Sequence, residues 1–118
     1  MEMSLGARGE SLAVDFLKRQ GYSIVQQNYR VPFGEIDIVA KDKDAVCFVE
    51  VKTRESLSCG SGLEAISRAK QRRIIRTAAW YLQEKGWEDC KVQFDVVAIA
   101  IYEDGGPVID FVQHAFEA

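Results

Sequence analysis

Residues 34–54, G-E-I-D-I-V-A-K-D-K-D-A-V-C-F-V-E-V-K-T-R, decide the fold of this 118-residue chain. Apolar and polar residues alternate on both sides of the polar segment Lys41–Asp44, which predicts two strands joined by a tight turn. In Cys47–Thr53 the period of two places Glu50 and Lys52 on one face and the intervening valines on the other. A buried sheet favours apolar residues, so these two charged side chains need a separate explanation.

The first of the two strands also carries an acid, Asp37. Alternation over Glu35–Ala40 predicts that Asp37 lies on one face and that Ile36 and Ile38 lie on the opposite one. If the hairpin is centred between residues 43 and 44, Asp37 lies directly opposite Glu50, because both are equally far from that centre. Opposed residues have Cβ atoms about 4.5–5.5 Å apart, and two carboxylates at that distance repel each other unless a cation lies between them.

A divalent ion would relieve that repulsion. Carboxylate oxygens suit hard cations, which makes Mg²⁺ or Mn²⁺ the expected ion. Lys52 would place an ammonium group beside the ion, where it could orient or deprotonate a water molecule or neutralise charge on a phosphate. A surface hairpin with one solvated face would also alternate charged and apolar residues, so the E-x-K pattern alone leaves both interpretations open.

Four short motifs occur in order along the chain: G-A-R-G-E at 6–10, G-E-I-D at 34–37, F-V-E-V-K-T-R at 48–54 and F-D-V-V-A-I at 94–99. The G-x-x-D and E-V-K parts resemble the active-site signature of the PD-(D/E)XK, restriction-endonuclease-like nucleases. With the other two motifs, the chain from about Gly6 to its C-terminus resembles the YraN family of small bacterial proteins, which is grouped with archaeal Holliday junction resolvases. The resemblance implies a restriction-endonuclease-like α-β-β-β-α-β core with a mixed central sheet flanked by helices.

The resemblance also implies a role for each residue of a metal site. Asp37 and Glu50 would bind Mg²⁺ together with the backbone carbonyl of Val51, and Glu10 would complete the ion's shell directly or through water. Lys52 would position or activate the attacking water. From the residues alone, Glu10 near the start of a helix could instead serve only to favour the helix dipole.

Charge is distributed unevenly along the chain. Between residues 52 and 76 there are seven basic residues and two acids, a net charge of +5, whereas the whole chain carries −3 and the remainder therefore −8. A basic region in an acidic protein suggests attraction for a polyanion, although a solvated helix face would look the same. We expect contacts to DNA phosphates from Arg8, Arg30, Thr53, Arg54, Arg68, Lys70, Arg72, Arg73 and Arg76. Nothing resembles a base-reading element, so recognition by DNA shape is expected.

Length and composition indicate one globular domain over residues 1–118, with 47% hydrophobic and 28% charged residues. No apolar run approaches the ~20 residues of a membrane span, and the first residues lack the pattern of a leader peptide. We therefore expect a cytoplasmic protein with no membrane contact and no small-molecule cofactor. Cys47, Cys59 and Cys90 form no C-x-x-C pair and only one histidine accompanies them, which argues against zinc and for free thiols.

Periodicity predicts the order helix, three antiparallel strands, long helix, strand, strand. The expected elements span Gly6–Gln20, Tyr22–Arg30, Glu35–Ala40, Cys47–Thr53, Leu63–Lys85, Lys91–Ile101 and Val108–Val112. The nearly continuous apolar character of Lys91–Ile101 favours a strand covered on both faces, returned parallel to an earlier strand by the long helix. Asp95 inside this run could bond to loop backbone or pair with an arginine, or it could act in catalysis. The glycine-containing segment after Arg54 could order over a substrate or act as a plain connector.

The sequence therefore predicts metal-dependent hydrolysis of DNA phosphodiester bonds by a Mg²⁺-dependent endodeoxyribonuclease. The resemblance to junction resolvases implies branched DNA as substrate and a homodimer as the assembly. Two other classes stay open: a nucleic-acid-binding module that keeps the nuclease fold without its chemistry, and a structural protein whose charged hairpin face is only solvent surface.

Overall fold

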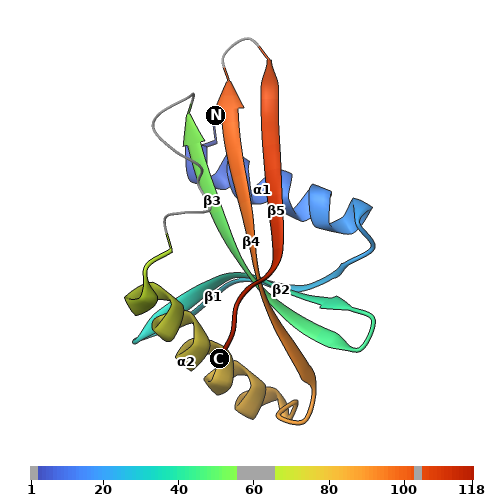
Figure 1. Cartoon of the computed structure of the whole chain (residues 1–118), viewed down its shortest axis with the longest axis vertical. Helices are drawn as coiled ribbons and strands as arrows, with labels where there is room; N and C mark the ends of the chain where they lie inside the picture. The colour runs from blue at the N-terminus through green and yellow to red at the C-terminus, as the bar shows by residue number, and fades with distance from the viewer. Residues whose placement is uncertain (1–2, 56–65, 103–104) are drawn as a thin grey trace.

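Five strands form one sheet in the order β1-β2-β3-β4-β5 (Figure 1). The structure, a computed structural model, describes residues 3–55, 66–102 and 105–118. Its elements are α1 (Leu5–Arg19), β1 (Ser23–Val31), β2 (Gly34–Asp42), β3 (Ala45–Glu55), α2 (Arg68–Lys85), β4 (Lys91–Tyr102) and β5 (Gly106–Phe116). The segment expected to follow Arg54 as a glycine-containing loop lies mostly outside the described residues.

The strand directions agree with the predicted topology. β1, β2 and β3 pair antiparallel in turn, β3 and β4 pair parallel, and β4 and β5 pair antiparallel. Helix α2 connects the two parallel strands β3 and β4, because parallel strands need a crossover connection. The mixed α/β fold with a restriction-endonuclease-like core is therefore confirmed.

The two helices pack against different residues of the sheet and bury two separate clusters. Ala13 and Leu17 of α1 pack with Ile38, Val49 and Val97. On the other face, Ile74, Ala78 and Tyr81 of α2 pack with one residue each from β2, β3 and β4, namely Val39, Phe48 and Phe94. Each fully buried large apolar side chain contributes roughly 1.5–3 kcal/mol, so both faces of β3 and β4 stabilise the fold.

Serine hydroxyls begin both helices. Ser4 accepts a hydrogen bond from the backbone N–H of Ala7 at 3.1 Å, and Ser67 accepts one from Lys70 N at 3.1 Å. The sequence places the start of the second helix too early, at Leu63. Ile66 and Ser67 are not helical and the helix begins at Arg68, because the Ser67 side chain caps it there; residues 63–65 lie outside the described ranges.

Strand β5 is longer than the predicted Val108–Val112, and its extension explains Asp95. The β4–β5 register shifts between Phe94 and Val96, which pair with Phe116 and Val112, and His114 in the bulged part has a φ of 53°. The buried Asp95 carboxylate accepts the His114 N–H at 3.0 Å and the Gln93 amide at 2.9 and 3.0 Å. Asp95 therefore accepts a hydrogen bond from a backbone N–H in the bulged part of the β4–β5 ladder. This is the structural role considered for Asp95 above, although its hydrogen-bond donors are not arginines.

Neither of the two described helices combines the length and the apolar character needed to cross a membrane. Cys47 is buried in β3 and Cys90 is exposed, while Cys59 lies outside the described residues.

Candidate functional site

The predicted metal site lies where strands β2 and β3 stop pairing. Their last pair is Ile38 with Val49, and the next residue on each strand is Asp37 or Glu50. Beyond this point β2 continues with β1 and β3 continues with β4, so the sheet opens into a fork (Figure 1). The register predicted from the symmetry of the hairpin is the observed one.

Asp37 is held at the fork by a backbone group of the other strand. Its Oδ2 atom accepts a hydrogen bond of 2.8 Å from the N–H of Val51, and its carboxyl group contacts that of Glu50. Burial and the repulsion of Glu50 raise the pKa of Asp37 to about 7, and the Val51 N–H only partly opposes this rise. Near neutral pH the Asp37 carboxyl is therefore close to half-protonated in the absence of a metal ion.

The prediction that Ile36 and Ile38 share a face is wrong. Ile38 packs in the cluster under α1, whereas Ile36 packs in the cluster under α2. The change of facing occurs at Asp37, where pairing with β3 ends and the ladder no longer imposes a period of two. The strand therefore turns at the residue that carries the candidate ligand.

Glu50 is 7% exposed and has a cation as its partner. Its Oε2 atom forms an ion pair with the ammonium of Lys70, which extends from the first turn of α2. Burial of a charged carboxylate costs free energy unless a cation is paired with it, so the ammonium of Lys70 stabilises the negative charge on Glu50. Lys70 was predicted to contact phosphate, and the resemblance also implied that it reaches towards the active site. Its ammonium pairs with a carboxylate of the candidate metal site.

Glu10 approaches the fork from α1. Gly9 allows this approach, because a Cβ at Gly9 would overlap the side chain of Thr53 on β3. One oxygen of Glu10 is buried without a hydrogen-bond partner, while the carboxyl group also bonds to Asn28. Burial raises the pKa of Glu10, and the Asn28 bond and the charge of Arg30 oppose that rise.

Glu10 adds to the repulsion that raises the pKa of Asp37, so the two carboxylates are electrostatically coupled. Over residues 3–55, 66–102 and 105–118, however, no three His, Cys, Asp or Glu side chains gather closely enough to hold an ion. The assembled part of the site is therefore the pair of Asp37 and Glu50, with Glu10 nearby.

The remaining predicted residues fall into four groups. Lys52 lies on the face of β3 that carries Glu50 and is half-buried, as is Arg54. Thr53 packs under Gly9, so its predicted phosphate contact gains no support. Arg30 forms an exposed 3.1 Å ion pair with Glu35. The other predicted arginines are exposed, on α1 or along α2: Arg8, Arg68, Arg72, Arg73 and Arg76.

Two contacts of the site are absent from the predictions made on sequence. The N–H of Val51 donates a hydrogen bond to Asp37, whereas the resemblance implied a role for the Val51 carbonyl. Asn28, with a φ of 54°, bonds to Glu10. Asparagine tolerates this left-handed conformation, but a single asparagine in a polar strand carries no signal that singles it out.

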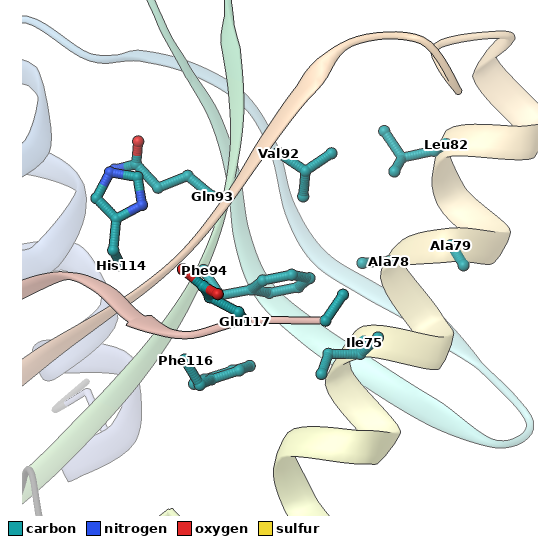
Figure 2. A pocket seen from close by; sticks show the side chains of 11 residues that line it. Ile75, Ala78, Ala79, Leu82, Val92, Gln93, Phe94, His114, Phe116 and Glu117 are labelled. Atoms are coloured by element: carbon teal, nitrogen blue, oxygen red, sulfur yellow. The ribbon is translucent and has the colours of Figure 1, made fainter.

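An apolar cavity lies elsewhere, between α2, the start of β4 and the end of β5 (Figure 2). Ile75, Leu82, Val92 and Phe116 are among the residues that line it, and His114 lies at its border. None of the predicted site residues is among its described lining residues.

The fold and the carboxylate pair at the fork define a restriction-endonuclease-like α/β protein. The chain belongs to the family described as Uncharacterised protein family UPF0102, whose model matches residues 9–99, and this is the YraN family that the motifs indicate.

Three relatives show how completely the chain matches this family. A UPF0102 protein of Desulfosudis oleivorans is 45% identical over 113 residues, covering 96% of this chain and 89% of the relative. One of Syntrophotalea carbinolica is 46% identical over 92% of this chain and 89% of its own length. One of Rhodococcus jostii is 45% identical over 97% of both chains.

Proposed function

We propose that this protein is a metal-dependent endonuclease that hydrolyses phosphodiester bonds of branched DNA. The observation that carries the proposal is the contact of the half-buried Asp37 with the buried Glu50 at the β2–β3 fork. Glu50 lies on β3, the strand that also bears Lys52. Maintaining two carboxylates in contact is unfavourable for the protein alone, which is typical of a site that receives a cation.

The donor set suits Mg²⁺ or Mn²⁺. Asp37 and Glu50 supply carboxylate oxygens, and the ammonium of Lys70 already takes a cation's place on Glu50. The unpartnered oxygen of Glu10 and the carbonyl of Val51 are further candidate donors. When bound, the ion would supply Lewis-acid stabilisation of charge on the scissile phosphate.

The chain's own residues have separate tasks in this proposal. Lys52 follows Glu50 by two residues and lies on the same face of β3. From there it donates a hydrogen bond that orients the attacking water, or it takes a proton from that water. Lys70 holds Glu50 in place before substrate binds. Arg68, Arg72 and Arg73 contact backbone phosphates along the exposed side of α2. The preference for branched DNA and the homodimer come from the sequence resemblance, and the cytoplasmic location comes from the apolar patterning of the sequence.

A cleavage assay tests the proposal. Labelled four-way junction, flap and linear duplex DNA are incubated with Mg²⁺ or Mn²⁺ and the wild type, Glu50→Gln, Lys52→Met or Glu55→Gln. We expect cleavage of branched DNA, a loss of about 10²-fold or more with the first two variants, and little change with Glu55→Gln, because Glu55 is exposed at the end of the same strand.

Other outcomes would reject the nuclease or its assigned site. Uncleaved DNA with a salt-sensitive gel shift would establish the non-catalytic binding module instead. Neither cleavage nor a shift would reject both, and cleavage that survives Glu50→Gln and Lys52→Met would place the chemistry at another site.

A further inference from the structure

An aromatic cluster lies on the surface of α2, away from the carboxylate pair. Trp80 is 46% exposed, and its ring centroid is 6.0 Å from that of Phe33, with the two planes at 88°. The guanidinium of Arg76 lies 4.6 Å from the centroid of Phe33. Phe33 comes from the turn between β1 and β2, so two elements build this cluster.

Core packing does not account for these side chains. Neither Phe33 nor Trp80 belongs to either of the two buried clusters or to the partly buried residues packed against them. A single exposed aromatic side chain is ordinary. An exposed tryptophan in contact with a second ring and an arginine can in addition stack on a planar ligand and make cation–π contacts with it.

The cluster continues the basic side of α2. Arg73, Arg76 and Trp80 are spaced by three and four residues and are all exposed, so they line one side of the helix. Lys70, which contacts Glu50, lies in the first turn of the same helix, ten residues before Trp80. At 1.5 Å per residue this separation is about 15 Å, the length of roughly four nucleotides of a duplex strand. A strand at the carboxylate pair could therefore reach the aromatic cluster.

We propose that Phe33, Arg76 and Trp80 form a stacking platform for unpaired DNA bases, so that the substrate carries a single-stranded segment next to the cleaved backbone. This inference rests on the proposed nuclease function and specifies its substrate. Bases within a duplex are already stacked on one another, whereas an unpaired base offers a free face to an aromatic ring. Arg73 and Arg76 provide the positive charge that such a strand requires, and the acidic Glu84, bonded to Tyr29, bounds the platform on its far side.

Fluorescence of Trp80 tests the platform without any cleavage. The chain has two tryptophans, so Trp87→Phe leaves Trp80 as the only one. This variant, with metal removed by a chelator, is titrated with oligothymidylate and with an oligomer of equal length that consists of abasic sugar-phosphate units. Both oligomers carry the same phosphates, and only the first carries bases.

We expect oligothymidylate to quench Trp80 and to bind at least about fivefold more tightly than the abasic oligomer. Exchange of Trp80 and Phe33 for alanine removes the tryptophan signal, so this variant is compared with its parent by the anisotropy of fluorescein-labelled oligomers. The exchange should reduce oligothymidylate affinity to that of the abasic oligomer and leave abasic binding unchanged. Gln83→Ala, an exposed neighbour on α2, is the matched control and should have no effect.

Equal binding of the two oligomers, or no effect of the double alanine exchange, would overturn the inference. Tighter binding of oligouridylate than of oligothymidylate would overturn its assignment to DNA. Failure here with intact cleavage of branched DNA would reject the platform alone, while stacking without cleavage would reject the nuclease alone.

Discussion

Asp37 is destabilised in its charged form, because burial and Glu50 both favour the protonated carboxyl. Its pKa of about 7 in the folded chain lies above the ordinary value of 3.8. Between these two pH values the folded state retains a proton that the unfolded state has released. Stability of the metal-free protein should therefore be highest below about pH 4 on account of this group and should fall as pH rises through 7.

Asp37→Asn should remove this dependence and stabilise the metal-free protein at pH 8. Asparagine keeps an oxygen that accepts the Val51 N–H but carries no charge towards Glu50. The gain should be on the order of 2–4 kcal/mol at pH 8 and small at pH 4, since one unit of pKa corresponds to about 1.4 kcal/mol. Urea unfolding at both pH values measures it, with the exposed Asp110→Asn as control. A less stable Asp37→Asn at pH 8 would contradict the crowded pair.

In the proposed metal site, Lys70 and a divalent ion would compete for the same carboxylate of Glu50. Lys70→Met should therefore raise the affinity for Mn²⁺ by about tenfold, while it destabilises the metal-free protein because the buried Glu50 loses its partner. Titration calorimetry and chemical denaturation measure the two effects. Arg72→Met, an exposed change on the same helix, is the control. Unchanged or weaker Mn²⁺ binding by Lys70→Met would show that the ion does not use Glu50.

At the scale of elements, α1 depends on one glycine for its contact with the sheet. Gly9→Ala should destabilise the protein by about 1–3 kcal/mol, because the added methyl group overlaps Thr53 and forces α1 away from β3. Thr53→Ala removes two of the three nearest atoms and should recover part of the loss in the double variant. Gly6→Ala has nothing within 4 Å and should cause no loss. Urea denaturation of the four variants decides, and equal effects of the two glycine changes would reject the close contact.

The hairpin was predictable because its own period and symmetry determine it. A centre between residues 43 and 44 is enough to bring Asp37 beside Glu50, and the alternation of β3 is enough to put Lys52 on the side of Glu50. The core residues of α2 from Ile74 to Leu82 follow from helical spacing in the same way.

Features that depend on tertiary contacts could not be predicted. Ile36 changes face only because β2 leaves β3, and β5 extends to Phe116 only because Asp95 bonds to the bulged backbone at His114. The partner of Lys70 depends on where α2 begins, which the short Ser67 cap determines. Local patterns therefore identify the carboxylate pair, and packing identifies the cation beside it.

At the scale of the whole molecule, the chain carries −3, yet the region from residue 52 to 76 carries +5. The proposal requires that this local charge, and not the net charge, governs DNA binding, since Coulomb interactions beyond about 8–10 Å are screened at physiological salt. Two sets of substitutions with the same change in net charge separate these possibilities.

The first set exchanges three exposed arginines of α2 for glutamine: Arg68, Arg72 and Arg73. The second exchanges three exposed basic residues at the end of α1 and the start of β4: Lys18, Arg19 and Lys91. The first set should weaken binding to duplex DNA and lower the slope of log affinity against log salt by about 2–3, because each lost phosphate contact removes about 0.9. The second should change that slope by less than about 1. Fluorescence anisotropy at several salt concentrations measures both. Equal slopes for the two sets would show that net charge governs binding, and the α2 face would then lose its assigned role.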